Sequence, residues 1–277
     1  MNFDSEIITS RNNQLVKWVA SLAEKKNRKE SGYFLAEGVK LTKEAFEAEL
    51  PVEYLIVSES KKTSVISFLG DVCLRDKYDK CRFITVSDSV FEKISTEKAP
   101  QGVISVIKHL DFFRDMDIIY KEEFFLKDEE KAIFLFSVRD PSNLGAVIRS
   151  SVAFGIDHII ISDDCADIYN PKTIRSAMGS IFRVNITTVK DVPAFIEAAR
   201  FNNRRIFAAE LTENAKSLSE IEMKKSDIVI IGNEGHGIDK EISVLCDNSI
   251  YIPISKKTES LNASVAAAIF MWEQSKS

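Results

Sequence analysis

From Ala132 to the end of the chain, short apolar runs alternate with stretches of helical periodicity. Strands that alternate with helices predict a mainly parallel sheet covered by helices on both faces, an α/β fold. Ligands of such sheets bind at the carboxyl ends of the strands, so we expect the loops there to carry the chemistry. The expected strands are Ile133–Val138, His158–Ile161, Ile181–Val189, Arg205–Ala209, Ile228–Ile231 and Ile250–Ile254, and the expected helices are Leu144–Phe154, Pro171–Met178, Val192–Phe201, Asp239–Cys246 and Asn262–Gln274.

The residues before this region predict a second, smaller α/β domain. A length of 277 residues is about twice that of a usual domain. We expect domains at 1–110 and 132–277, joined by a charged, partly helical linker at 111–131. The smaller domain has expected strands at Tyr33–Ala36, Val52–Val57, Arg82–Val86 and Val103–Ile107, and expected helices at Val39–Leu50 and Ser89–Ile94.

Net charge gives no whole-molecule argument for nucleic acid, because 37 basic residues face 42 acidic ones. The basic residues are nevertheless unevenly placed. Leu15, Trp18, Val19 and Leu22 predict an amphipathic helix with its apolar face turned inward, which would leave the nearby bases outward. The alternative is an ordinary solvated helix face. The basic residues of this patch are Arg11, Lys17, Lys25, Lys26, Arg28 and Lys29.

The four cysteines are scattered and indicate neither a zinc site nor a disulfide framework, so we expect no metal and mostly buried, reduced thiols. The N-terminus lacks a signal-peptide pattern, and no apolar run approaches the length of a membrane span. We therefore expect a cytoplasmic protein without membrane contact.

The first polar loop after an expected strand runs from Asp140 to Arg149 and leads into a helix. Pro141 fixes the turn, and Ser142 or Asn143 can cap the helix. Such a stretch can simply start a helix, with Arg149 in a surface ion pair. Alternatively, Arg149 offers a fork of donors to a phosphate or an electron-rich oxygen, and Asn143 acts as a polar clamp.

The second loop, from Gly232 to Gly237, contains three glycines after an apolar strand. Glycines permit positive φ and a close approach of the backbone to a ligand, although a plain glycine-rich turn is an alternative. The spacing matches neither the dinucleotide fingerprint nor the P-loop. Glu234 lies between two glycines, where a carboxylate would face the ligand cleft. His236 is more typical of an incidental exposed residue than of a base.

The third loop follows Ile252 and leads through Ser260 and Asn262 into a helix rich in alanine. Ser260 or Asn262 can serve merely as a helix N-cap. A helix with so many small residues needs close packing, and a second subunit is a candidate partner.

Together, these loops resemble the three signature motifs of the SpoU, or TrmH, family of RNA 2′-O-ribose methyltransferases in the SPOUT class. The segment Asn170–Ser180 is also similar to a family segment, with Ala177 where serine is frequent. Ser10–Lys17 and Phe34–Gly38 resemble the RNA-binding domain that precedes the catalytic domain in many SpoU enzymes. The motif residues are Asn143, Gly145 and Arg149 in the first loop, Gly232, Glu234, Gly235 and Gly237 in the second, and Ile252, Pro253, Ser260, Leu261 and Asn262 in the third.

The resemblance implies a trefoil-knotted C-terminal domain that binds S-adenosylmethionine and works as a homodimer. It also implies that the basic N-terminal helix grips RNA phosphates. The implied catalytic residues are Asn143, Arg149, Glu234, Ser260 and Asn262, and the implied main-chain contacts to the cofactor are at Ala209, Gly232, Ile252 and Leu261.

The implied reaction is in-line attack of a ribose 2′-hydroxyl on the sulfonium methyl group. The family assigns proton removal to the arginine that matches Arg149, but a guanidinium group stays protonated at ordinary pH and is a poor base. Either its surroundings make Arg149 transiently basic, or it stabilises the developing alkoxide while water takes the proton; we favour the second. Asn143 and Ser260 would align ribose or cofactor, Glu234 would hold arginine or substrate groups, and Asn262 would shape the cofactor loop.

The expected substrate is large-subunit (23S) ribosomal RNA, although the sequence does not name the nucleotide. A transfer RNA 2′-O-methyltransferase is one alternative, and a non-catalytic RNA-binding assembly factor is another. The presence of all five polar motif residues argues against the assembly factor. A nucleotide-dependent oxidoreductase is disfavoured by the missing dinucleotide fingerprint.

Overall fold

The computed structural model describes residues 6–74, 78, 80–119, 121–233 and 235–277. By its packing the chain divides into two compact units. The first comprises Met1–Leu110 with Asp167–Phe182, and the second comprises Asp111–Ala166 with Arg183–Ser277. The segment Asp167–Phe182, which lies inside the expected range 132–277, therefore packs with N-terminal residues.

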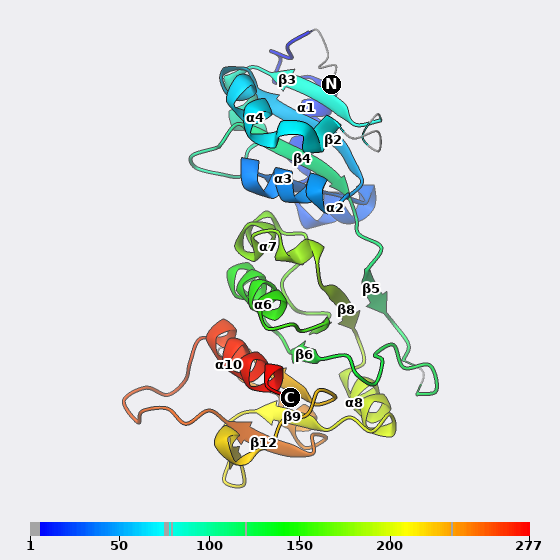
Figure 1. The fold of residues 1–277 in the computed structure, drawn as a ribbon, viewed down its shortest axis with the longest axis vertical. Helices are drawn as coiled ribbons and strands as arrows, with labels where there is room; N and C mark the ends of the chain where they lie inside the picture. The colour runs from blue at the N-terminus through cyan, green and yellow to red at the C-terminus, as the bar shows by residue number, and fades with distance from the viewer. Residues whose placement is uncertain (1–5, 75–77, 79, 120, 234) are drawn as a thin grey trace. The chain divides into compact units, whose positions relative to one another are not determined.

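The first unit is built on a mixed sheet whose described strands have the order β1-β4-β2-β3 (Figure 1). Strand β4 pairs antiparallel with both β1 and β2, and β2 pairs parallel with β3. The elements are α1 (Gln14–Ser21), α2 (Lys25–Ser31), β1 (Tyr33–Glu37), α3 (Val39–Glu47), β2 (Val52–Ser58), α4 (Lys62–Leu69), β3 (Arg82–Val86), α5 (Asp88–Ile94), β4 (Val103–Lys108) and α7 (Pro171–Ala177).

The expected amphipathic helix is present but is divided into α1 and α2. Asn13 caps α1 by accepting from the amide of Leu15 at 2.8 Å, and α2 ends at Gly32, which has a φ of 73° that suits glycine. Val19 and Leu22 are fully buried against the sheet, as their spacing predicts.

Several contacts hold the segment Asp167–Phe182 to the rest of the first unit, three of which involve Asp167 and Tyr169. The guanidinium group of Arg28 pairs with the carboxylate of Asp167. The ring of Tyr169 stacks on that of His109, with centroids 4.1 Å apart, and its hydroxyl oxygen accepts from the amide of Leu110 at 2.7 Å. Because Tyr169 and Arg28 are both buried, this segment is part of the unit's core.

The second unit is built on a sheet in which every described pairing is parallel (Figure 1). The described strands have the order β10-β12-β9-β11-β6-β7-β8-β5. The expected parallel α/β architecture is therefore confirmed, whereas the trefoil knot stays a prediction. The elements are β5 (Phe113–Met116), β6 (Ala132–Leu135), α6 (Pro141–Ala153), β7 (His158–Ser162), β8 (Asn185–Val189), α8 (Val192–Phe201), β9 (Ile206–Ala209), β10 (Lys216–Ser217), β11 (Ile228–Ile231), α9 (Lys240–Ser243), β12 (Asn248–Tyr251) and α10 (Ala263–Ser275).

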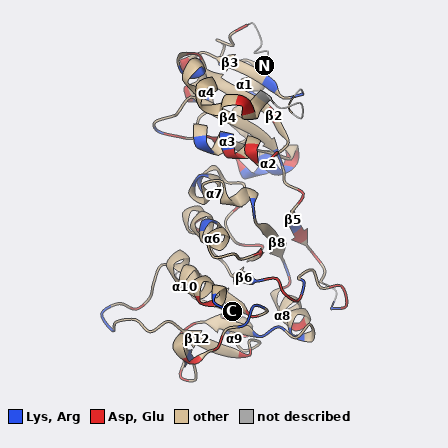
Figure 2. Cartoon of the chain, viewed as in Figure 1, with Lys and Arg blue, Asp and Glu red and all other residues tan. Residues whose placement is uncertain are grey.

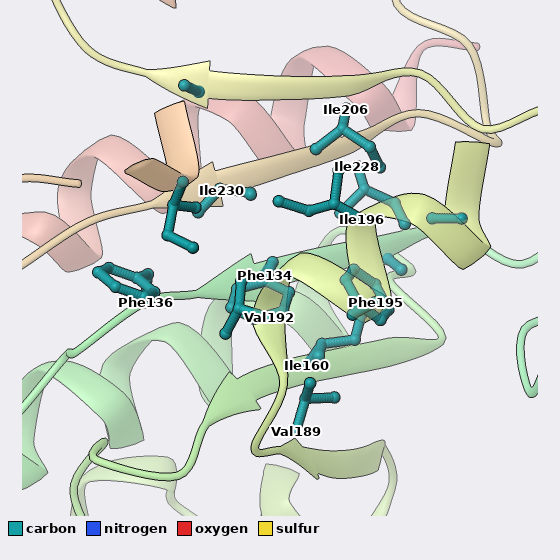
Figure 3. Packing of buried hydrophobic residues seen from close by; sticks show 14 of the residues in the cluster. Phe134, Phe136, Ile160, Val189, Val192, Phe195, Ile196, Ile206, Ile228 and Ile230 are labelled. Atoms are coloured by element: carbon teal, nitrogen blue, oxygen red, sulfur yellow. The ribbon is translucent and has the colours of Figure 1, made fainter. Parts of the chain in front are cut away.

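Helices cover both faces of this sheet. On one face, Phe195 and Ile196 of α8 pack with alternate strand residues such as Phe134 (Figure 3). The intervening strand residues, among them Ile133 and Val229, are equally buried. Helices α6 and α10 pack against each other, and Gln274 of α10 donates to the carbonyl of Asp227, just before β11, at 2.7 Å. Burial of both faces explains why the strands read as continuous apolar runs.

Several stretches differ from the expected elements: α4 and β10 were not expected, β12 lies at Asn248–Tyr251 instead of Ile250–Ile254, and α9 is shorter than the expected helix Asp239–Cys246. The expected partly helical linker contains β5, which pairs parallel with β8 at the edge of the sheet. An edge strand is half solvated, and the charged residues Arg114 and Asp115 hide it in the sequence. The expected strand Ile181–Val189 is shorter, because Ser180–Phe182 form a 3₁₀ turn before β8.

The cysteines are placed as free thiols. Cys73, Cys81 and Cys165 are buried and Cys246 is half-buried. Burial raises the pKa of Cys81 and Cys246 to about 12 and that of Cys165 to about 11, so these thiols are poor nucleophiles.

No helix in the described part of the chain is both long enough and apolar enough to cross a membrane.

Candidate active site at the carboxyl edge of the parallel sheet

Three of the expected cofactor contacts lie at the carboxyl ends of neighbouring strands. Ala209 is the last residue of β9, Gly232 follows β11, and Ile252 follows β12, and β9 lies between the other two strands. Ala209 and Ile252 are both half-buried. The parallel sheet thus brings residues from three separate segments to one edge.

The first loop starts α6 through a different cap from the one expected. The Asp140 carboxylate accepts from the amides of Ser142 at 2.6 Å and Asn143 at 3.2 Å, so Asp140 is the N-cap. Pro141 occupies the first helical turn, where its missing N–H costs no hydrogen bond. The side chain of Asn143 is therefore not used as the cap.

Asn143 instead contacts the third loop. The side-chain amide of Asn262 donates to the Oδ1 atom of Asn143 across 3.0 Å. The Oδ1 atom of Asn262 caps α10 by accepting from the backbone amide of Ser264 at 2.9 Å. The two ends of one amide thus perform two tasks: its oxygen starts a helix, and its nitrogen joins the first loop to the third.

Arg149 and Ser260 are both exposed, and each lies within six residues of one partner in the hydrogen bond between Asn143 and Asn262. Arg149 lies on α6, about two turns after Asn143. Ser260 precedes Asn262 by two residues, and its carbonyl accepts from the Thr258 hydroxyl at 3.2 Å. Leu261, which follows Ser260 in the chain, is half-buried.

The glycine loop, Gly232–Gly237, closes on itself. Asn233 and Gly237 exchange backbone hydrogen bonds of 3.0 and 2.9 Å, and Gly237 has a φ of 71°. A Cβ atom added to Gly232 would lie 2.4 Å from the carbonyl carbon of Gly237, so the loop requires glycine there. Glu234, an expected catalytic residue, lies outside the described residues. His236 is exposed.

Sequence reasoning missed the polar groups that join these loops. Asn233 donates from Nδ2 to the carbonyl of Ser137 at 2.7 Å, and its Oδ1 accepts from the amide of Gly235 at 2.8 Å. Ser137 and Ser162 in turn both donate to the carboxylate of Asp164. An asparagine beside a glycine is a frequent turn signal, but nothing in the sequence pairs it with Ser137.

Asp164 stays ionised in this network. Burial acts to raise its pKa, but hydrogen bonds from Ser137, Ser162 and Arg139 outweigh burial and hold the pKa below its ordinary value. The guanidinium group of Arg139 lies 2.9 Å from the same carboxylate. A cavity of about 460 Å³ adjoins the network, lined by residues that include Ser137, Asp164 and Asn233.

The basic patch of the first unit is only partly as expected. Lys17, Lys25, Lys26 and Lys29 are exposed, and Arg11 is exposed while donating to the carbonyl of Ser89. Figure 2 shows basic and acidic residues together on α2. Arg28 corrects the expectation that all six bases lie outward.

Arg28 is only 2 % exposed. Besides pairing with Asp167, it donates to the backbone carbonyls of Leu22 and Ala23 at 2.7 and 2.6 Å. All of these partners are internal to the first unit, so Arg28 stabilises the fold and is not available to phosphate.

The carboxyl edge fits an adenosine-containing cofactor held by main chain. Ala209 offers a short side chain and Ile252 an apolar one, so the backbone at the ends of β9 and β12 can be approached closely, whereas the space of a side chain at Gly232 is filled by Gly237. Among the described residues, no group of three or more His, Cys, Asp or Glu residues is arranged to hold a metal ion.

This arrangement defines a class: an α/β protein with a parallel sheet whose polar loops meet at the carboxyl edge. Residues 130–272 match the SpoU rRNA methylase family, and residues 13–105 match the MRM3-like substrate-binding domain. The chain therefore belongs to the SpoU rRNA methylase family, a family of RNA methyltransferases.

Relatives along the whole chain agree with this assignment. The 23S rRNA (guanosine(2553)-2′-O)-methyltransferase RlmP of Bacillus subtilis is 29 % identical, with 96 % of this chain and 97 % of the relative covered. The 23S rRNA (uridine(2479)-2′-O)-methyltransferase of Streptomyces viridochromogenes is 28 % identical, with 96 % and 90 % covered.

Solved structures show the same fold. The crystal structure of an rRNA methyltransferase from Sinorhizobium meliloti is 26 % identical, has a TM-score of 0.81, and covers 98 % of this chain and 97 % of its own. A structure described as the AdoMet-bound rRNA methyltransferase from the same organism is 24 % identical with a TM-score of 0.78, over the same shares of both chains.

Proposed function

We propose that this protein transfers a methyl group from S-adenosylmethionine to a ribose 2′-hydroxyl of large-subunit ribosomal RNA in the cytoplasm. The observation that carries the proposal is the hydrogen bond between Asn262 and Asn143, which joins two motif loops at the edge where Ala209, Gly232 and Ile252 also lie. The sulfonium of the cofactor supplies an electrophilic methyl group.

The chain's own residues position the ribose and stabilise charge. The hydrogen bond between Asn143 and Asn262 joins the start of α6 to the start of α10, so the two side chains form one polar surface. Ser260 and Leu261 precede α10 in the same loop and would extend this surface. Fixed polar groups of this kind lower the barrier mainly by holding the reacting atoms in line.

Arg149 would face the attacking oxygen. A guanidinium group carries a permanent positive charge and several N–H donors in a fixed plane. As the 2′-hydroxyl loses its proton to water, the negative charge on its oxygen grows, and an oriented cation beside it stabilises the transition state. Arg149 is exposed on α6, so an RNA strand can reach it. Glu234 is proposed to hold Arg149 or a substrate group.

The first unit would supply RNA affinity. Lys17, Lys25, Lys26 and Lys29 are exposed on or beside α1 and α2, and Arg11 lies before α1. Phosphate contacts of this kind position an RNA without reading its sequence. We assign RNA binding to residues 1–110 and methyl transfer to residues 132–277, for which the resemblance predicts a trefoil knot, with 111–131 as the connection. The matches to residues 13–105 and 130–272 support this division.

A homodimer through the second unit is part of the proposal. Val265 and Trp272 of α10 are 47 % and 50 % exposed, and Ile269 lies between them on the same helix face. Such an apolar stripe on an exposed helix is typical of a protein interface. The substitution Val265→Asp should convert a dimer into a monomer in sedimentation equilibrium. A wild-type chain that sediments as a monomer would contradict this part.

Methyl transfer is tested with radiolabelled S-adenosylmethionine and two RNA pools. Protein is incubated with unmodified large-subunit ribosomal RNA and, separately, with unmodified transfer RNA. Incorporation into ribosomal RNA alone, recovered as a 2′-O-methyl nucleotide after digestion, supports the proposal. Incorporation into transfer RNA alone would contradict ribosomal RNA as the substrate and identify the protein as a transfer RNA methyltransferase. RNA binding without incorporation in either pool would favour the non-catalytic factor.

A further inference from the structure

Ser137 has an unusual backbone conformation at the carboxyl end of β6. Its φ is 55°, in the left-handed region that non-glycine residues rarely adopt. Such a conformation persists only where the surroundings fix it, and these conformations cluster at functional sites. Ser137 lies three residues before Asp140, the cap of the helix that carries Asn143 and Arg149. Its conformation therefore sets the direction in which the chain enters α6.

Loops after two other strands hold Ser137 in place. The amide of Ser137 donates to the hydroxyl of Ser162, the last residue of β7, at 2.8 Å, and its hydroxyl donates to the carboxylate of Asp164 in the loop after β7. Its carbonyl accepts from the Nδ2 atom of Asn233, in the glycine loop after β11. The backbone amide, the backbone carbonyl and the side chain of Ser137 are thus all engaged.

Asn233 divides its side chain between two loops. Its Oδ1 atom accepts from the amides of Gly235 and His236 at 2.8 and 3.3 Å, which shapes the glycine loop. Its Nδ2 atom reaches across to Ser137. One half-buried amide therefore fixes the glycine loop and ties it to the entry of α6.

We propose that Asn233 is a positioning residue, which keeps Asn143 and Arg149 in register with the glycine loop. It does so through the hydrogen bond from its Nδ2 atom to the carbonyl of Ser137, which we call the clasp. This inference rests on the proposed methyl transfer. Because α6 follows Ser137 after a short turn, loss of the clasp lets the helix start shift relative to the glycine loop. The reacting groups tolerate little displacement, so the rate of transfer suffers more than binding.

Two substitutions remove the clasp and retain the loop turn. Asn233→Asp keeps an oxygen that can accept from Gly235, but it places an oxygen without a proton against the Ser137 carbonyl. Asn233→Ser also keeps a short acceptor, has no charge and cannot reach Ser137. The use of both variants separates loss of the clasp from the added charge, and a second variant remains if one fails to fold.

The measurements are kcat, the KM values for RNA and S-adenosylmethionine, and the Tm. We expect kcat to fall at least tenfold in both variants, while both KM values change less than threefold. Asn202→Asp is the matched control. Asn202 donates from Nδ2 to the carbonyls of Lys121 and Ala198 at the end of α8, so its loss should lower Tm without changing kcat.

Hydrogen exchange gives a second readout, in peptides that cover residues 136–148. Exchange there should accelerate in both Asn233 variants and stay unchanged in Asn202→Asp. If kcat stays within twofold of wild type in both Asn233 variants, or if only Tm falls, Asn233 is a structural residue and the proposal is wrong. A wild-type protein without any transfer would instead overturn the proposed function, and the positioning role with it.

Discussion

The side-chain amides of Asn143 and Asn262 meet across 3.0 Å, although 119 positions separate the two residues in the sequence. One lies in the first turn of α6 and the other caps α10. Because these helices also pack against each other, the contact is held from both sides. It places two of the three motif loops within one hydrogen bond of each other.

The substitution Asn262→Asp tests the contact without removing the helix cap. Aspartate is as good an N-cap as asparagine, so α10 should start at the same residue. The carboxylate has no proton to donate to Asn143, and two oxygens would then face each other. We expect kcat for methyl transfer to fall about tenfold or more, with Tm lowered by only a few degrees, as measured by steady-state kinetics and calorimetry.

Asn185→Asp is the control for this prediction. Asn185 also donates from its amide, to the carbonyl of Asp157, but it lies at the amino end of β8, away from the motif loops. The same chemical change there should leave kcat within twofold of wild type. Equal losses in both variants would mean that added charge, and not the contact with Asn143, causes the effect.

Arg149→Ala should lower kcat at least 100-fold while S-adenosylmethionine binding stays within severalfold. Loss of a single group that stabilises developing charge typically costs this much. Arg149→Lys should recover part of the rate, since a lysine also carries a positive charge. The control is Arg200→Ala, which removes an exposed arginine of α8 that pairs with Asp247. Near-normal turnover in Arg149→Ala would remove Arg149 from the mechanism.

The basic residues of α2 should separate into two kinds. Replacing Lys25, Lys26 and Lys29 together with alanine should weaken RNA binding about tenfold and make it less sensitive to salt, because fewer counterions are released. The measurement is fluorescence anisotropy with a ribosomal RNA fragment at several salt concentrations. Unchanged affinity and salt dependence would place the RNA on another surface.

Arg28→Ala should behave in the opposite way. It leaves the carboxylate of Asp167 without its buried partner, which typically costs about 3 to 5 kcal/mol of the free energy of unfolding. Urea denaturation measures this loss. The RNA affinity of the protein that remains folded should be unchanged. A loss of RNA affinity with stability retained would show that Arg28 contacts RNA after all.

His158 should make the protein less stable as the pH falls. Burial, together with Arg114 and Arg204, lowers the pKa of His158 from 6.5 to about 4. Between these values the unfolded chain binds a proton that the folded chain does not, so the free energy of unfolding decreases as the pH falls from about 6.5 to 4. The full effect is about 3 kcal/mol. Urea denaturation at several pH values measures it.

The control for His158 is the exposed His236. His158→Gln should flatten the pH dependence in this window, whereas His236→Gln should leave it unchanged. His158 also shares a 2.7 Å hydrogen bond with Thr187, so the variant should be less stable at neutral pH as well. An identical slope in His158→Gln and wild type would mean that another group titrates.

Elements with a strong apolar pattern could be read from the sequence. Helix α8 and strand β11 begin and end at the expected residues. The buried residues of α8 recur at helical spacing, and the residues of β11 are buried on both faces of the sheet. Strand β5 was missed because its polar side chains point to solvent at a sheet edge. The break between α1 and α2 was missed because the helical spacing of Leu15 to Leu22 continues up to it.

Site residues that belong to a local sequence motif could be predicted. Site residues that act through hydrogen bonds between segments far apart in the sequence could not. Asn143, Asn262 and Arg149 belong to segments whose residue spacing matches a family motif. Ser137 and Asn233 act through hydrogen bonds between loops 96 positions apart, and no local pattern encodes such a pairing. Arg28 was misplaced for the same reason, since its partner Asp167 lies 139 positions away.

The most direct test of the central claim is to map 2′-O-methyl groups in ribosomal and transfer RNA from cells with and without this protein. The account predicts that one ribose methylation in large-subunit ribosomal RNA disappears without the protein and returns with wild-type protein, but not with Arg149→Ala. Ribose methylation that is identical in both kinds of cell, in every ribosomal and transfer RNA, would contradict it.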